Sequence, residues 1–246
     1  MTCSYKTARP GRANAGAMSS TSTASHHNPG EWQQSAEAVC LAPAEYIDSH
    51  HPLVAAQAGR LRAAAGTERD AARAIYYFVR DLTYEGGDFE DLEIFRASSV
   101  LAAGHGYCVG KASLCAALAR AAGIPARISF ADVRNHLASP RLLQAMGTDI
   151  FAWHGYTELL LGATWIKVSP TFDIGICQRA GVAALEFDGE HDAMLQSFDG
   201  TSSMHYVREH GAFHDVPARF LAEEMQRLYP FTRSHGVSRF IAGARP

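Results

Sequence analysis

The chain has 246 residues, of which 47% are hydrophobic and 19% are charged, as is usual for a globular protein with one hydrophobic core. Its 22 basic and 25 acidic residues give a formal net charge of −3, so the overall charge favours neither nucleic acid nor an anionic membrane surface as a partner. No apolar stretch approaches the roughly 20 residues of a membrane-spanning helix and no signal peptide is evident, so we expect a cytoplasmic protein.

The two ends of the chain differ in composition from its middle. Residues 1–30 are rich in Ser, Thr, Ala, Gly and Asn, which predicts a disordered tail, and Met18 within this tail is an alternative start of translation. We expect a single folded domain over residues 31–232 and a frayed extension over residues 233–246.

Apolar spacing and capping residues predict four helical segments before the first strand. Residues 52–65 begin with a proline, and residues 67–82 begin with a Thr–Asp capping pair; both segments place apolar side chains at helical spacing. Residues 98–104 form a short helical turn that ends at a glycine. The run 108–122 is apolar, lacks proline and stops at Gly123, which predicts a further helix.

Strand patterns follow this last helix. Residues 126–133 predict a strand, and residues 134–148 predict a polar connection. Residues 153–161 and 164–168 predict a hairpin around a two-residue Gly–Ala turn. Near the C-terminus, apolar spacing over residues 218–228 predicts a helix.

The cysteines do not form a structural set. Their number is odd and no CxxC pair occurs, which argues against a disulfide framework and against a zinc site. We therefore expect no metal and no cofactor, and each cysteine is considered alone. They are Cys3, Cys40, Cys108, Cys115 and Cys177.

Cys108 has the context of a nucleophile. It follows a glycine-containing loop and begins a predicted helix, whose unpaired N–H groups favour a thiolate and offer a donor to an oxyanion. The alternative for any cysteine is a small buried side chain, which is the interpretation we give to Cys115 on the apolar side of the same helix.

A catalytic thiol needs a base, and His154 is the histidine best placed for this role. It begins the first strand of the predicted hairpin beside a glycine. If Leu161 pairs with Thr164 across the turn, His154 lies opposite Thr171. Alternation then puts three polar side chains on the face of His154. These are Ser169, Thr171 and Asp173.

Several short motifs occur in one order over residues 67–175. They are Gly106-x-Cys108, the sequence AGIPAR over 122–127, Trp153-His154, and Trp165-x-x-x-Ser169-Pro170-Thr171. This combination resembles the transglutaminase-like superfamily. The resemblance implies a papain-like α+β fold, in which a nucleophile helix packs on an antiparallel sheet that carries the histidine and an acid or amide. It also implies acyl chemistry through a thioester on the cysteine.

The chain departs from the family motif at the third catalytic position. The family has an aspartate where this sequence has Ser169. We favour Asp173 as the residue that orients His154, because strand alternation places it on the same face of the sheet as His154. Ser169 is the alternative. Tyr84 or Tyr107 could supply an oxyanion donor, as a residue well before the cysteine does in the family.

Four residues are expected to contact the substrate. Arg134 follows the predicted strand 126–133 and could bind a carboxylate of the substrate. A solvated ion pair on the surface is an equal alternative for this residue. The four are Tyr107, Arg134, Trp153 and Ser169.

The sequence thus predicts a thiol-dependent hydrolase or acyltransferase. Its substrate would be a peptide-like amide, or an acyl thioester together with an amine, and its catalytic residues would be Cys108, His154 and Asp173. One alternative is a biosynthetic amide-forming transferase, and the other is a non-catalytic binding module of the same fold.

Overall fold

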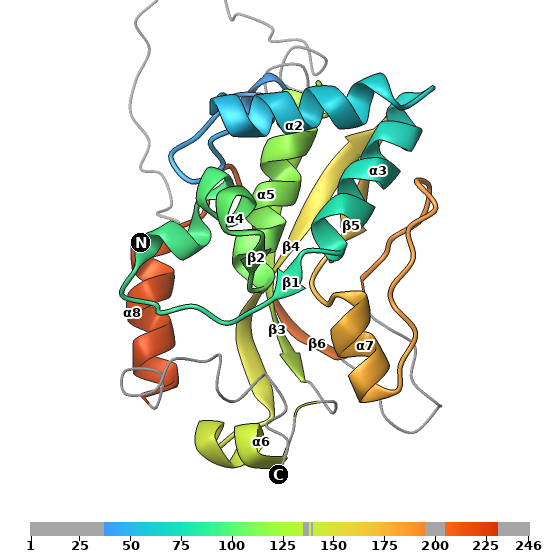
Figure 1. Cartoon of the computed structure of the whole chain (residues 1–246). Coiled ribbons are helices and arrows are strands. Elements are labelled where there is room, and N and C mark those ends of the chain that lie inside the picture. The colour runs from blue at the N-terminus through green and yellow to red at the C-terminus, as the bar shows by residue number, and fades with distance from the viewer. Residues whose placement is uncertain (1–36, 135–137, 139, 195–204, 231–246) are drawn as a thin grey trace, which may run out of the picture.

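A computed structural model describes residues 37–134, 138, 140–194 and 205–230 of the chain. The predicted tail over residues 1–30 and the predicted extension over residues 233–246 lie outside these ranges. Helices cover one face of an antiparallel sheet, as Figure 1 shows. This is an α+β fold in which a helix that begins at a cysteine packs on the sheet, as predicted. Within the described residues, no helix is long and apolar enough to cross a membrane.

In the described part of the chain, the main sheet contains four strands in the order β5-β4-β3-β6, each antiparallel to its neighbour. The strands are β3 (Ala126–Arg134), β4 (Ile150–Leu161), β5 (Thr164–Val168) and β6 (His205–Phe213). The predicted hairpin register is confirmed, because Leu161 pairs with Thr164. Gly162 has a φ of 65°, which a glycine adopts without steric cost. β6 is an edge strand and is mostly exposed, so it lacks the apolar alternation that would predict it.

The predicted helices form with boundaries close to those expected. Thr67 caps α3 by accepting the N–H of Asp70 at 3.1 Å, and Gly104 ends α4 in the left-handed conformation. The helices are α2 (Pro52–Ala63), α3 (Glu68–Arg80), α4 (Ala97–Ala103), α5 (Cys108–Ala121) and α8 (Ala218–Leu228), with a short 3₁₀ turn, η1 (Leu92–Phe95).

Further short elements were not predicted. α6 (Pro140–Met146) lies inside the segment expected to be a polar connection, where Pro140 is suited to begin a helix. α7 (Ile174–Ala180) is capped by Asp173. A short parallel pair, β1 (Thr83–Tyr84) with β2 (His105–Gly106), joins the segment before Cys108 to Tyr84. These short elements depend on partners distant in sequence, which local patterns do not reveal.

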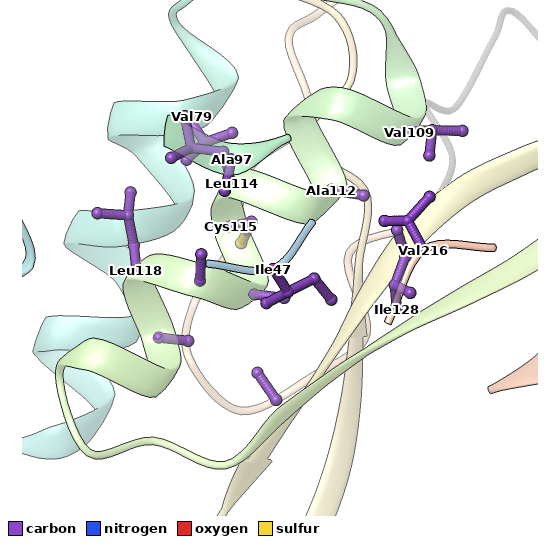
Figure 2. Close-up of a cluster of buried hydrophobic side chains, with 14 of the residues drawn as sticks. Ile47, Val79, Ala97, Val109, Ala112, Leu114, Cys115, Leu118, Ile128 and Val216 are labelled. Atoms are coloured by element: carbon purple, nitrogen blue, oxygen red, sulfur yellow. The ribbon is translucent and has the colours of Figure 1, made fainter. Parts of the chain in front are cut away.

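The core is built around α5. Every residue from Val109 to Arg120 is buried, because α5 contacts α2, α3 and α4 on one side and β3 and β4 on the other. Figure 2 shows apolar side chains from several segments gathered around this helix, including Ile47, Val79 and Ile128. Cys115 belongs to this core, as predicted. A helix enclosed in this way gives its first residue, Cys108, a fixed position.

Candidate active site

Cys108 is the first residue of α5 and is partly exposed. The other cysteines within the described residues, Cys40, Cys115 and Cys177, are buried. Desolvation by burial raises the pKa of the Cys108 thiol to about 11, while the backbone N–H groups of Gly155, Val109 and Cys108 itself act in the opposite direction. The helix start therefore favours the thiolate as expected, but desolvation outweighs it. At neutral pH the resting sulfur is a thiol.

Gly155 brings the histidine strand onto the start of α5. A Cβ atom at this position would lie 2.9 Å from the Cα atom of Val109, so only glycine permits this approach. β5 pairs only with residues 157–161 of β4, so Gly155 lies outside this pairing, and Val109 in the first turn of α5 packs against it. The residue before Gly155 is His154, so this contact brings the strand that carries the candidate base onto the start of the cysteine helix.

His154 is buried, and one of its ring nitrogens has a hydroxyl partner. Its Nε2 atom lies 3.2 Å from Oγ of Ser169, and that oxygen lies 2.9 Å from Oγ1 of Thr171. Burial lowers the pKa of His154 to about 4, so the imidazole is neutral at neutral pH. Two of the three polar side chains expected on this face are therefore in place.

The expected contact between Asp173 and His154 is not formed. The Asp173 carboxylate accepts the backbone N–H of Tyr84 at 2.8 Å and that of Ile176 at 2.9 Å, and these bonds lower its pKa against the effect of burial. The strand alternation behind the expectation fails because β5 ends at Val168. The chain then turns into α7 and takes Asp173 out of the sheet.

Tyr84 lies near Cys108. The backbone N–H of Cys108 faces its hydroxyl, and burial raises the pKa of Tyr84 well above its usual value, so the hydroxyl stays protonated. Its ring packs against Phe172 with a centroid distance of 5.2 Å. Tyr84 is held from two sides, by the β1–β2 pairing and by the bond of its N–H to Asp173.

Tyr107 has a different environment from Tyr84. Its ring is buried between Phe89 and Phe95, at centroid distances of 5.6 and 5.8 Å. Its hydroxyl is buried and has no hydrogen-bond partner among the described residues. Burial raises the pKa of this phenol well above its usual value.

Trp153, the residue before His154, has a backbone conformation that is rare for a non-glycine residue. Its φ is 56°, its N–H donates to Oδ1 of Asp132 at 3.1 Å, and its indole stacks on His210 at a centroid distance of 3.8 Å. Nε2 of His210 lies 2.7 Å from the same Asp132 oxygen. Sequence patterns did not reveal His210, because its strand, β6, was not predicted. Strain of this kind is often found at functional sites.

Arg134, the remaining residue expected to contact substrate, ends β3. It forms an ion pair with Asp149 at 2.9 Å, and both side chains are more than 40% exposed. The structure thus contains the solvated ion pair that was the alternative for Arg134. Within the described residues, no group of three or more His, Cys, Asp or Glu side chains could hold a metal ion.

A helix that begins with a cysteine and packs on an antiparallel sheet bearing a histidine defines a transglutaminase-core type of α+β fold. Residues 55–170 match the model of the transglutaminase-like superfamily core. The chain thus carries a transglutaminase-like superfamily core domain, which contains Cys108, His154 and Ser169.

Two solved structures are similar to this chain over part of their length. One is a candidate cysteine protease from Cytophaga hutchinsonii, with 19% identity and a TM-score of 0.43 over 68% of this chain and 61% of that one. The other is described as a TGase, with 16% identity and a TM-score of 0.34 over 62% of this chain and 36% of that one. This chain thus spans less than two thirds of either structure. A comparison with curated proteins finds no match.

Proposed function

We propose that this protein is a thiol-dependent acyl-transfer enzyme with Cys108 as nucleophile and His154 as general base. The observation that carries the proposal is the close approach of Gly155 to the first turn of α5, which sets the residue after His154 against the cysteine helix. A partly exposed thiol at a helix start and a buried neutral imidazole are the two groups that such chemistry needs.

The first half-reaction forms a thioester. His154 takes the thiol proton of Cys108 as the sulfur attacks the carbonyl carbon of an amide or thioester. The carbonyl electron pair moves to oxygen and then returns, which breaks the bond to the leaving group, and His154 gives its proton to that group. Water or an amine then attacks the thioester carbonyl and loses a proton to His154. The carbon–sulfur bond breaks, the acyl product leaves, and His154 returns the proton to the Cys108 sulfur.

The negative oxygen of the intermediate has two candidate donors. One is the backbone N–H of Cys108, the first residue of α5. The other is the protonated hydroxyl of Tyr84, which lies near that N–H. Both donors are held by the fold before substrate arrives, and this is the condition for effective stabilisation of an oxyanion. We therefore assign Tyr84, and not the enclosed Tyr107, to this role.

We also assign the orientation of His154 to Ser169, whose hydroxyl is its hydrogen-bond partner. Ser169→Ala should lower kcat/KM by about tenfold, the value of one hydrogen bond of roughly 1.4 kcal/mol. Asp173→Asn should have a smaller effect, because the amide oxygen can still accept the N–H groups of Tyr84 and Ile176.

Steady-state kinetics of both variants, with folding verified by circular dichroism, decides this assignment. A larger loss in Asp173→Asn than in Ser169→Ala would return the role to the aspartate. Ser169→Asp offers a second check, because a carboxylate beside His154 should stabilise the imidazolium and move the acid limb of the rate profile to higher pH.

Intact-mass analysis tests the proposed function itself. The protein is incubated with activated acyl thioesters and with peptide amides, and we expect an acyl adduct on Cys108, located by peptide mapping. Cys108→Ala should form no adduct, while Cys115→Ala should behave like the parent apart from a loss of stability, because Cys115 is buried in the core. Hydroxylamine should release the acyl group as a hydroxamate, whereas water should release it as an acid. An adduct that persists in Cys108→Ala would contradict the proposal.

A further inference from the structure

Lys111 is a lysine whose side chain is completely buried, one helical turn after Cys108 on α5. Lysine is among the residues least often found in such a position, because an ammonium group loses its hydration there. Its Nζ atom donates to three backbone carbonyls, those of Arg80 at 3.0 Å, Leu82 at 2.7 Å and Thr171 at 2.7 Å. The acyl-transfer mechanism above gives this group no role.

The three carbonyls belong to the two segments that hold the other groups of the site. Leu82 lies two residues before Tyr84, and Arg80 ends α3. Thr171 carries the hydroxyl that contacts Ser169, which in turn contacts His154. The side chain of Lys111 therefore contacts both the segment before Tyr84, the proposed oxyanion donor, and the segment of Thr171, which follows Ser169. Figure 1 shows β1 and β2 beside the first turn of α5, where these segments meet.

The acceptors around Lys111 favour its charged form. An ammonium has three hydrogens for the three carbonyl oxygens, whereas a neutral amine would turn its lone pair toward one of them. Burial lowers the pKa of Lys111 to about 7, even though carboxylates counteract this shift. The titratable groups that face it are Asp173, Asp81, Cys177 and Arg80. The charge of Lys111 in turn favours the thiolate of Cys108.

We propose that Lys111 is a positioning residue of the active site, which fixes Leu82 and Thr171 against the helix that carries Cys108. Through these contacts the ammonium aligns Tyr84 and the Ser169–Thr171 hydroxyls with the sulfur, and it places a positive charge one turn from the thiol. The inference rests on the proposed function of Cys108, because positioning has a meaning only if the thiol reacts.

Arg120 on the same helix provides a matched control. It is also buried and also donates to three backbone carbonyls, those of Ala126, Ala42 and His214. It lies twelve residues after Cys108, which corresponds to about 18 Å along a helix axis. Arg120→Met therefore removes an equivalent buried cation and its bonds without touching the active site.

The experiment compares the rate of Cys108 alkylation by iodoacetamide in the parent, Lys111→Met and Arg120→Met as a function of pH. Near pH 6 we expect Lys111→Met to react about tenfold more slowly, the factor of one pKa unit. The difference should shrink as the pH rises past about 7, where the parent lysine loses its charge. Arg120→Met should lower the melting temperature but follow the parent profile.

A loss of reactivity in Lys111→Met that is the same at every pH, or an equal loss in Arg120→Met, would show that the effect is only structural and would overturn the proposal. If Lys111→Met does not fold, Lys111→Gln retains two donors and serves in its place. Failure of both variants to fold, with Arg120→Met folded, would assign Lys111 to the fold alone. Because alkylation needs no substrate, a failure of the acyl-transfer proposal would leave this comparison intact.

Discussion

His154→Gln is expected to lower kcat/KM for acyl transfer by about 10²–10⁴-fold, the range for loss of a general base. The glutamine amide can keep a hydrogen bond to Ser169 but cannot take the proton of the Cys108 thiol. Because burial raises the thiol pKa to about 11, little thiolate exists at neutral pH without such a base. The same adduct assay that identifies the substrate class gives the rate of acylation.

The pH profile provides the decisive readout for His154. Its pKa is lowered to about 4, so the parent rate should fall below about pH 4 as the imidazole takes up a proton, and this acid limb should be lost in His154→Gln. Folding stability must be followed in parallel. Between the unfolded-state pKa of about 6.5 and the folded-state value, only the unfolded chain binds this proton, so stability falls as the pH decreases through that range.

His214→Gln is the matched control for this measurement. Burial also lowers the pKa of His214, but this histidine lies beside Arg120, away from the start of α5. The variant should keep the parent rate and the parent acid limb. If the acid limb persisted in His154→Gln and disappeared in His214→Gln, the assignment of the base would be wrong.

The helix that begins at Cys108 and the hairpin that carries His154 could be predicted from the sequence because both depend on local patterns. Cys108 begins a helix that ends at a glycine, and the two-residue turn at Gly162 fixes the register that places His154 near Ser169. Alternation along one strand then carries the prediction as far as Val168. Beyond that residue β5 ends, and the position of Asp173 depends on its bond to the N–H of Tyr84, 89 residues away in the chain.

The environments of Lys111 and His210 could not be predicted from the sequence for a related reason. Lysine is rarely buried, and the three carbonyl partners of Lys111 come from segments that only the folded chain brings together. His210 lies on an exposed edge strand without apolar alternation, and its stacking on Trp153 follows from an unusual φ. Both are products of tertiary contacts that no local pattern encodes.

Tyr84→Phe is expected to lower kcat by about 10²–10³-fold, the usual effect of removing one oxyanion donor. The change deletes the hydroxyl that faces the N–H of Cys108 and leaves the ring packing against Phe172 intact. Because the carbonyl oxygen gains its negative charge only in the transition state, KM should change little. Single-turnover acylation with the substrate found by the adduct assay measures this step.

Two comparisons make the test of Tyr84 specific. Tyr107→Phe removes a buried hydroxyl that has no partner among the described residues, so it should leave the rate unchanged and should not destabilise the fold. Alkylation of Cys108 by iodoacetamide passes through no oxyanion, so Tyr84→Phe should alkylate at the parent rate while its acylation rate falls. Equal losses in alkylation and acylation would mean that Tyr84 affects the reactivity of the Cys108 thiol and not the oxyanion. A loss confined to Tyr107→Phe would assign the oxyanion donor to Tyr107.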